Sequence, residues 1–252
     1  MKQIVLMYHD IIGHDKKASG FLQTAALKYK VNVDNFEAQI AAVDRYLKDK
    51  GLCKNQVVFT FDDGGESFLT EAAPILEKYG FSGIFFIATG YIGTPGFLSV
   101  SQIKELAARG HIIGSHSHSH PSRMNSLKPS EIVEEWRYSK MLLDDILPAE
   151  TKIASIPNGY SSKEVLRAMR DNGLTELYTS EPVTKIRHYM NAQVIGRYAV
   201  TCNTTIDMLI NLISSRGVRI RLALRYKSLG ILKRLLGDTY PKLKKHFSNQ
   251  KQ

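Results

Sequence analysis

Residues 57–88 read VVFTFDDGGESFLTEAAPILEKYGFSGIFFIA, and this stretch sets the pattern that decides the fold. An apolar run at Val57–Phe61 is followed by a segment of helical period at 67–79 and by a second apolar run at Gly83–Ala88. Nearly continuous apolar strands joined by a helix are typical of a parallel sheet that is covered on both faces. Gly80 lies where the end of the helix favours a residue that tolerates positive φ. We therefore expect a βαβ unit here.

The same alternation continues through most of the chain. Further strands are expected at Gln3–Tyr8, His111–Ser115, Lys152–Ile156, Leu177–Thr179 and Val194–Ala199. Further helices are expected at 34–49, 99–109, 129–146, 162–172 and 204–214. Strands that alternate with helices in this way indicate a parallel α/β fold. Polar residues follow the strands all along the series rather than at one crevice, so we expect the sheet to close into a barrel instead of staying open and doubly wound.

Composition excludes several classes of protein. The 252 residues are 43% hydrophobic and 23% charged, unlike a disordered, collagen-like or coiled-coil chain. Cys53 and Cys202 form no CxxC pair and are too few for a disulfide framework. The first apolar run contains Tyr8, His9 and Asp10, which a secretion signal would lack, and no 18 consecutive residues are apolar. We therefore expect a cytoplasmic protein.

The net charge of +10 is concentrated at the end of the chain. Eleven of the 34 Lys and Arg residues, but only one acid, Asp238, lie from Arg216 onward, so residues 1–215 are balanced. A diffuse nucleic-acid-binding surface over the body is thereby disfavoured. We expect a barrel domain at 1–215 and a basic helical extension at 216–252.

The basic extension allows two interpretations. Residues that can share one helical face are Val218, Leu222, Leu229, Leu232, Leu235 and Leu236. The helix could pack this face on the barrel and leave a solvated basic side. Alternatively, it could lie at the inner face of the membrane, attracted by anionic lipid. A nucleic-acid-binding arm is disfavoured because no aromatic residues are interleaved with the cations in a binding motif.

Three strand ends carry residues that can bind a metal ion, and the first of them is Tyr8-His9-Asp10. Asp62-Asp63-Gly64-Gly65 follows one predicted strand, and residues 116–121, HSHSHP, follow another. Imidazoles and a carboxylate are a usual ligand set for a catalytic divalent metal. The alternative is an ordinary solvated polar loop. Of the two aspartates, one could bind the metal and the other could act as a base, because neighbouring strand residues point in opposite directions.

The spacing of the histidines leaves their roles open. An extended segment would place His116, His118 and His120 on one face, whereas a helical turn would bring only the first and last together. Pro121 disfavours a helical conformation at His120, so the residues alone do not decide.

The TFDDG run at 60–64, together with HSHSHP about fifty residues later and the order of elements, resembles the polysaccharide deacetylases, carbohydrate esterase family 4. The resemblance covers roughly residues 3–200. It implies a distorted (β/α)7 barrel with a bound metal, usually zinc, that removes N-acetyl groups from sugars. Carried over residue by residue, it makes Asp62 the catalytic base. It makes Asp63, His116 and His120 the metal ligands.

The chain departs from the family in its third motif. That motif usually begins with an arginine that orients the base, but residues 155–160 here read SIPNGY. Arg197, at the end of the seventh predicted strand, could substitute through space, or it could be an ordinary surface charge.

The motifs that supply the remaining catalytic groups are also altered. Glu181 is the acid nearest to the place of the fourth motif, whose tryptophan is absent. The Leu-x-His that supplies the general acid is not visible, and His9 is our first substitute for protonating the leaving amine. His188 is a weaker substitute, and Asp62 itself could shuttle the proton.

The resemblance predicts a metal-dependent sugar N-deacetylase. Tyr8-His9 and residues 179–182, TSEP, are more similar to bacterial enzymes of O-antigen or exopolysaccharide synthesis than to chitin deacetylases. The expected substrate is an N-acetylated sugar, polysaccharide or lipid-linked precursor. Two alternatives stay open: a hydrolase of cyclic imides or ureides on the same fold, and a degenerate relative that binds carbohydrate without turning it over.

Overall fold

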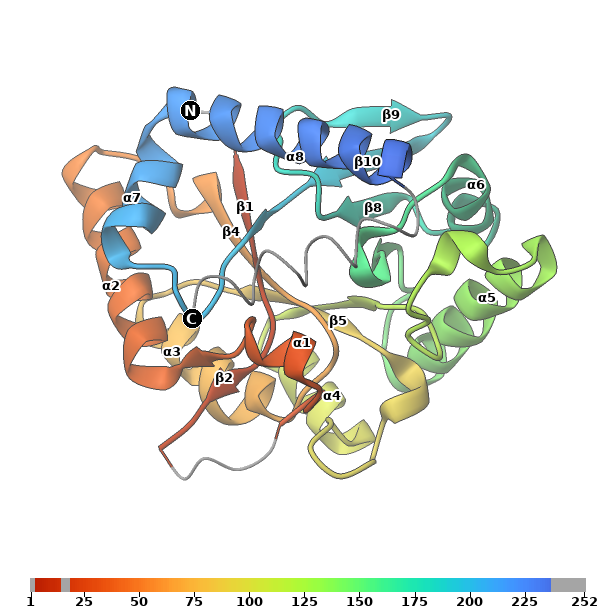
Figure 1. The fold of residues 1–252 in the computed structure, drawn as a ribbon. Helices are drawn as coiled ribbons and strands as arrows, with labels where there is room; N and C mark the ends of the chain where they lie inside the picture. The colour runs from red at the N-terminus through yellow and green to blue at the C-terminus, as the bar shows by residue number, and fades with distance from the viewer. Residues whose placement is uncertain (1–2, 15–18, 237–252) are drawn as a thin grey trace.

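The computed structural model describes residues 3–14 and 19–236, with side chains described as far as Gly230. Figure 1 shows a curled sheet with helices around its outside. The strands are β1 (Ile4–Tyr8), β2 (Ile11–Ile12), β3 (Val31–Asn32), β4 (Val57–Phe61), β5 (Gly83–Ile87), β6 (Ile112–Ser115), β7 (Ile153–Ser155), β8 (Glu176–Thr179), β9 (Arg187–Tyr189), β10 (Ala192–Gly196) and β11 (Tyr198–Ala199).

Most helices lie within the predicted segments. They are α1 (Thr24–Leu27), α2 (Val33–Asp49), α3 (Ala73–Lys78), α4 (Val100–Ala108), α5 (Pro129–Ile146), α6 (Lys163–Asp171), α7 (Ile206–Ser214) and α8 (Arg216–Leu236). A π-helical turn at Phe68–Ala72 leads into α3, and short 3₁₀ turns lie at Lys54–Gln56, Thr89–Tyr91, Met124–Ser126 and Pro157–Gly159. The sequence did not predict α1, β2, β3 and β9, because elements of two to four residues are too short to show a period.

The main sheet closes through a strand that is split in two. Its nine strands follow the order β11-β1-β4-β5-β6-β7-β8-β10-β9, and β9 joins β10 as an antiparallel edge. The predicted strand Val194–Ala199 is divided into β10 and β11. β10 pairs with β8, and β11 pairs with β1 at the other end of the strand order. Arg197 is the single residue between the two halves. The prediction of a distorted barrel is confirmed, and the distortion lies at this break.

Both faces of the strands are buried, as their continuous apolar sequences predicted. Ile4, Leu6 and Tyr8 of β1 belong to the large cluster under helices α2, α3, α4 and α7. Val5, between them in sequence, belongs instead to a small cluster with Phe86 and other inward residues of the curled sheet. Because side chains alternate along a strand, each strand has an outward row under the helices and an inward row that lines the barrel.

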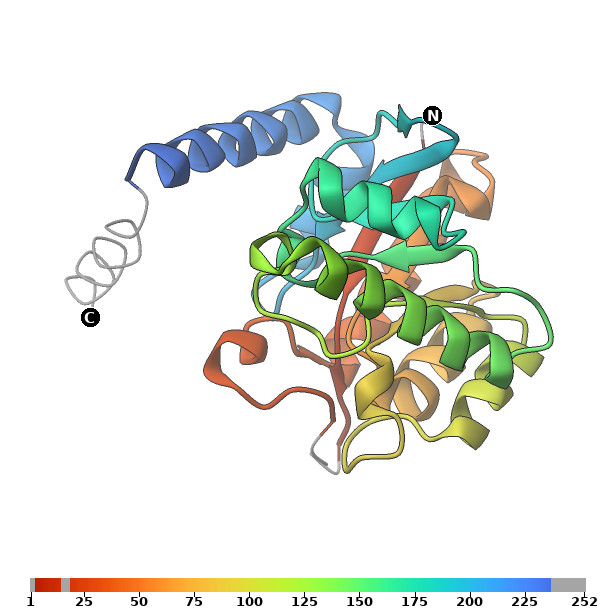
Figure 2. The same cartoon turned by 90° about the vertical axis from the view of Figure 1, so that its right-hand side faces the viewer.

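Helix α8 extends away from the barrel. It follows α7 after a break at Ser215 and runs out beyond the rest of the molecule (Figure 2). The predicted boundary at 215/216 coincides with this break, while the division into two domains stays a prediction. Residues 237–252 of the predicted extension lie outside the described residues. No helix in the described part of the chain is both long and apolar enough to cross a membrane.

Candidate metal centre and active site

Four strand ends bring polar side chains together inside the barrel. Asp62, His116, Ser155 and Arg197 continue the inward rows of β4, β6, β7 and β10, one or two residues beyond the apolar part of each strand. In a parallel barrel the carboxyl ends of the strands open on one face, where catalytic residues are positioned. Side chains from four separate parts of the sequence therefore meet at this face.

Asp62 and Arg197 form a buried ion pair. The Nη1 and Nη2 atoms of Arg197 donate to the two carboxylate oxygens of Asp62 at 2.6 and 2.7 Å. Arg197 is fully buried and Asp62 is 2% exposed. Thr60 accepts a further hydrogen bond from Arg197 Nη1 at 3.2 Å. Burial is the largest influence on the pKa of Asp62 and acts to raise it. The charge and hydrogen bonds of Arg197, together with the nearby imidazoles of His116 and His9, outweigh burial, so that the pKa lies below its ordinary value and the carboxylate stays ionised.

The turn after β4 directs Asp63 toward the two histidines. Asp63 has a φ of 91°, which takes the chain out of the strand and turns its side chain from the outward row. Gly64 and Gly65 follow, and a Cβ at Gly65 would lie 1.9 Å from the Oδ1 atom of Asp10. This tight approach explains why the sequence has glycine there.

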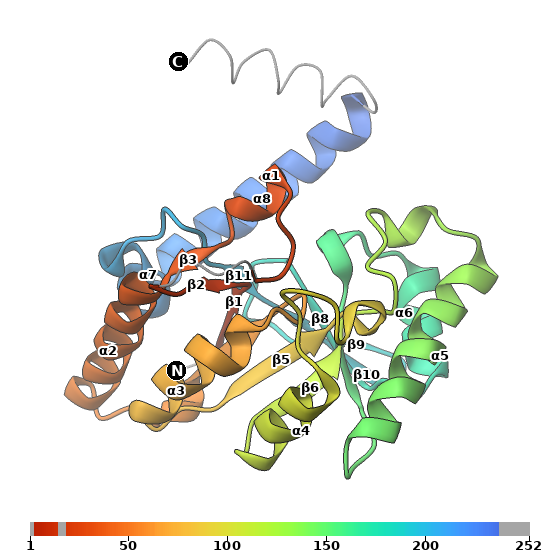
Figure 3. The same cartoon turned by 90° about the horizontal axis from the view of Figure 1, so that it is seen from below.

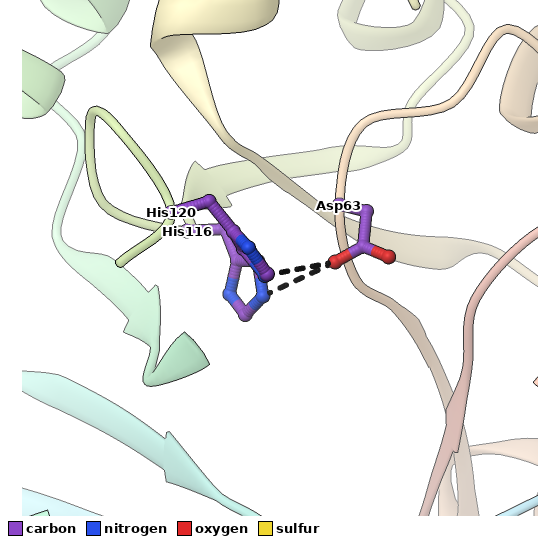
Figure 4. A group of neighbouring side chains, drawn as sticks. All are labelled: Asp63, His116 and His120. Carbon is purple, nitrogen blue, oxygen red and sulfur yellow. Dashed lines mark ion pairs between the residues drawn. The ribbon is translucent and has the colours of Figure 1, made fainter. Parts of the chain in front are cut away.

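Asp63, His116 and His120 are arranged as a set of metal ligands. The Oδ1 atom of Asp63 lies 3.5 Å from His116 Nε2 and 3.3 Å from His120 Nε2. Figure 4 shows both rings directed at the carboxylate. The three ligand atoms all lie within 4.8 Å of one another. Ligands about 2.0–2.1 Å from a tetrahedral metal are separated by about 3.3–3.4 Å, close to the two measured distances.

The hydrogen bonds of His116 fit the same role. Its Nδ1 atom lies 3.1 Å from the carbonyl oxygen of Ser155 and 2.5 Å from the Ser155 hydroxyl. An Nδ1–H that donates to the carbonyl leaves the Nε2 lone pair free for a metal. Burial acts to raise the pKa of Asp63, but the neighbouring imidazoles of His116 and His120 hold it well below its ordinary value. The residues present therefore fit a divalent cation.

The loop between the two histidine ligands is neither extended nor helical. Ser117 and His120 have φ values of 64° and 55°, so two left-handed residues bring the first and last histidines together. His118 turns away, and its Nδ1 atom lies 3.1 Å from the hydroxyl of Thr89. The carboxylate of Glu135 on α5 accepts from the backbone N–H groups of His118 and Ser119 at 3.0 and 2.8 Å and from the Ser119 hydroxyl at 2.5 Å.

His9 lies beside the two aspartates. It follows β1, and its imidazole is among the groups that lower the pKa of both Asp62 and Asp63. Its ring packs on Tyr29 with the ring centroids 4.6 Å apart. The Nδ1 atom is buried and has no hydrogen-bond partner among the described residues. The role of His9 as the general acid stays a prediction.

Glu181 and His188 are placed differently. Glu181 forms an ion pair with Arg187 at 2.6 Å, and in the described part of the chain no hydrogen bond joins it to Asp62 or Asp63. His188 lies exposed on the edge strand β9. The structure therefore does not bring these two residues into the cluster, and the catalytic role of Glu181 stays a prediction.

Three residues of the site were not singled out from the sequence. Ser155 stands where the family has its arginine, and its hydroxyl donates to Asp62 Oδ1 at 3.1 Å as well as contacting His116. Phe21 packs on His120, with ring centroids 4.6 Å apart. Glu135 holds the histidine loop from a different element. No local signal marks them, because their partners lie far away in the sequence.

Taken together, the fold and the site define an α/β barrel protein that can hold a divalent cation beside an ionised carboxylate. Residues 49–177 match the family model described as polysaccharide deacetylase. Because this match covers half of the chain, the chain belongs to the polysaccharide deacetylase family.

Curated relatives agree with this family. YxkH of Bacillus subtilis (strain 168), whose name assigns it to the same family, is 35% identical over 135 residues, which are 54% of this chain and 48% of YxkH. The poly-beta-1,6-N-acetyl-D-glucosamine N-deacetylase of Staphylococcus aureus (strain MRSA252) is 27% identical over 58% of this chain and 59% of that protein. The chain thus spans about half the length of these curated relatives.

The solved structure of the Streptococcus pyogenes deacetylase PplD in complex with acetate shares the fold. It superimposes with a TM-score of 0.65 at 23% identity and covers 85% of this chain and 99% of that one. At this identity the likeness concerns the fold alone.

Proposed function

We propose that this protein is a metal-dependent hydrolase that removes N-acetyl groups from a polysaccharide. The observation that carries the proposal is the Asp63, His116 and His120 ligand set beside the ionised Asp62–Arg197 pair. The family supports the substrate class. A divalent cation bound there supplies Lewis acidity and lowers the pKa of a coordinated water.

The residues of this chain divide the proton transfers between them. Asp62 takes a proton from the water that attacks the acetamide carbonyl, and Arg197 holds the carboxylate in orientation through both oxygens. His9 gives a proton to the nitrogen as the C–N bond breaks. Acetate and a free amine leave, which balances the water consumed.

We further propose zinc as the metal and a bacterial surface polysaccharide as the substrate. Two nitrogens and one carboxylate oxygen with an open fourth position suit a catalytic zinc site. The S. aureus relative named as a poly-beta-1,6-N-acetyl-D-glucosamine N-deacetylase supports an exopolysaccharide, whereas the O-antigen setting rests on the sequence likeness alone. A location at the inner face of the membrane is part of the same proposal.

Acetate release tests the proposal. The zinc-loaded protein is expected to release acetate from poly-β-1,6-N-acetylglucosamine oligomers, and a chelator should abolish the release. Asp63→Ala should lose zinc and activity together, because one of three ligands is removed. Asp62→Asn should retain zinc, measured by elemental analysis, and lose turnover by several orders of magnitude.

Three results would contradict the proposal. If Asp62→Asn kept its turnover, Asp62 would not be the base. If the zinc-loaded protein bound the oligomers but released no acetate, it would be a carbohydrate-binding relative. Hydrolysis of a cyclic imide or ureide, without release of acetate from the oligomers, would favour the alternative hydrolase of cyclic imides or ureides on the same fold.

A further inference from the structure

Helix α8 turns one side toward the body. Val218, Leu222 and Ala223 are half-buried, and Leu222 packs against the large core cluster. The Nη1 atom of Arg219 donates to the carbonyl oxygens of Leu212 and Ile213, at the end of α7, at 2.7 and 2.8 Å. The apolar face predicted from the sequence therefore begins, at Val218 and Leu222, as a packing face, whereas Leu229 further along it is exposed.

The opposite side of α8 carries a second apolar strip. Ile220 and Leu224 lie four residues apart on one face and are 48% and 63% exposed. At 3.6 residues per turn, Arg216 and Lys227 border this strip on one side, and Arg221 and Arg225 border it on the other. All four cations are exposed, and residues 216–230 contain no acid.

We propose that this outer strip of α8, Ile220 and Leu224 with their four flanking cations, binds an anionic membrane surface. A helix lying at a bilayer interface buries apolar side chains at the level of the headgroups and keeps its cations beside the phosphates. Long Arg and Lys side chains can reach outward while their stems cover apolar surface. The strip provides both kinds of contact on one side of one helix.

Helix α8 and the α1 segment, which is close to the site, project from the body in one direction. Figures 2 and 3 show that α8 and the α1 segment project on the same side of the body. The segment before α1 carries Phe21, which packs on the metal-ligand candidate His120.

Two other occupants would fit this strip less well. A second copy of this chain would set four cations against four cations, which repel each other. A nucleic acid would satisfy the cations but would leave Ile220 and Leu224 without an apolar partner. Acidic lipid satisfies both requirements.

Vesicle sedimentation of the full chain tests the proposal without any dependence on enzyme activity. The protein is expected to bind phosphatidylcholine vesicles that contain phosphatidylglycerol and not vesicles of phosphatidylcholine alone. Leu224→Glu should weaken binding by at least about tenfold, since the strip loses an apolar anchor and gains a negative charge. Arg221→Gln with Arg225→Gln should weaken it roughly 25-fold, since each cation near an anionic surface contributes about fivefold.

Matched variants separate the strip from overall charge. Met141→Glu changes an exposed apolar residue of α5 to the same acid and should bind as the unaltered protein does. Arg45→Gln with Lys104→Gln removes two exposed cations elsewhere and should also leave binding within twofold. The proposal is overturned if these controls bind as weakly as the α8 variants, if neutral vesicles bind equally well, or if the protein binds DNA but no vesicles. Circular dichroism should show the same unfolding midpoint for every variant, because all of these side chains are exposed.

Discussion

Asp62 and Arg197 concentrate two charges in the interior of the barrel, where each would be costly alone. The guanidinium pairs with both carboxylate oxygens and also contacts Thr60 and the backbone carbonyl of Thr179. A buried ion pair is tolerated when such hydrogen bonds satisfy both partners, but it adds little net stability compared with apolar residues. The structure therefore points to orientation of Asp62 as the main contribution of Arg197.

Removing one partner of this pair should reveal the cost of the other. Arg197→Met is expected to lower the free energy of unfolding by about 3–5 kcal/mol, because it leaves the Asp62 charge buried and uncompensated. Adding Asp62→Asn should restore part of that loss, since the uncompensated charge is then gone. Urea denaturation of the metal-free single and double variants measures both effects.

The opposite outcome would be equally informative. If the losses from the two single substitutions simply added in the double variant, the two side chains would not be coupled. The bidentate contact would then make no contribution to the state of Asp62.

At the level of elements, the histidine loop depends on helix α5. Glu135 accepts three hydrogen bonds from residues between the two histidine ligands. Ser139, one turn later on α5, is 2.7 Å from the hydroxyl of Ser115, which in turn accepts from the Ser117 N–H. Because Ser117 and His120 adopt left-handed conformations that are unfavourable for such residues, outside contacts are needed to hold them.

The loop should therefore lose metal affinity when Glu135 is removed. Glu135→Ala is expected to lower zinc affinity by about 10- to 100-fold, as is usual for partners that orient metal ligands. The zinc affinity of Glu135→Gln should lie between those of Glu135→Ala and the unaltered protein, because the amide oxygen still accepts a hydrogen bond. Competition with a chelating dye measures the affinity.

The neighbouring glutamate on α5 is the matched control. Glu134 pairs with the exposed Arg137, so Glu134→Ala should leave zinc affinity unchanged. Equal losses of affinity in Glu134→Ala and Glu135→Ala would show that helix α5 acts through its stability and not through the loop.

Across the whole molecule, His111 links three parts of the barrel wall. Its Nδ1 atom accepts from the Gly83 N–H of β5 at 3.1 Å, and its Nε2 atom lies 2.9 Å from Glu77 Oε1 on α3. Glu77 also pairs with Arg109, which follows α4, at 2.8 Å. Burial lowers the pKa of His111 below 6.5, although Glu77 acts in the opposite direction.

This shift predicts how stability depends on pH. In the unfolded chain His111 takes up a proton near pH 6.5, whereas the folded chain resists protonation until the pH is lower. The unfolded state thus binds more protons on acidification, and stability falls below about pH 6.5 and is fully present above it. Urea denaturation of the metal-free protein between pH 7.5 and 5 should show a shallower decline for His111→Asn. An unchanged decline in that variant would show that other groups cause the acid sensitivity.

The sequence by itself determined the strands and helices that build the barrel, because hydrophobic period and helix-end residues are local signals. Predicted and observed bounds coincide for β4 and α5 and differ by one residue for β1 and α2. It also placed Asp62, Asp63, His116 and His120 at strand ends, since a parallel barrel gathers the carboxyl ends of its strands on one face. The likeness to a family supplied their expected roles.

Only the tertiary structure decided which side chains meet. Arg197 reaches Asp62 across 135 residues of sequence because the last predicted strand breaks at that residue, with β10 paired to β8 and β11 paired to β1. His120 and not His118 approaches Asp63, because two left-handed residues and a helix from another part of the chain shape the loop. The side of α8 that faces solvent was likewise set by packing on the core. Such contacts depend on the closure of the ring and on backbone conformations that distant residues stabilise, and no local pattern encodes them.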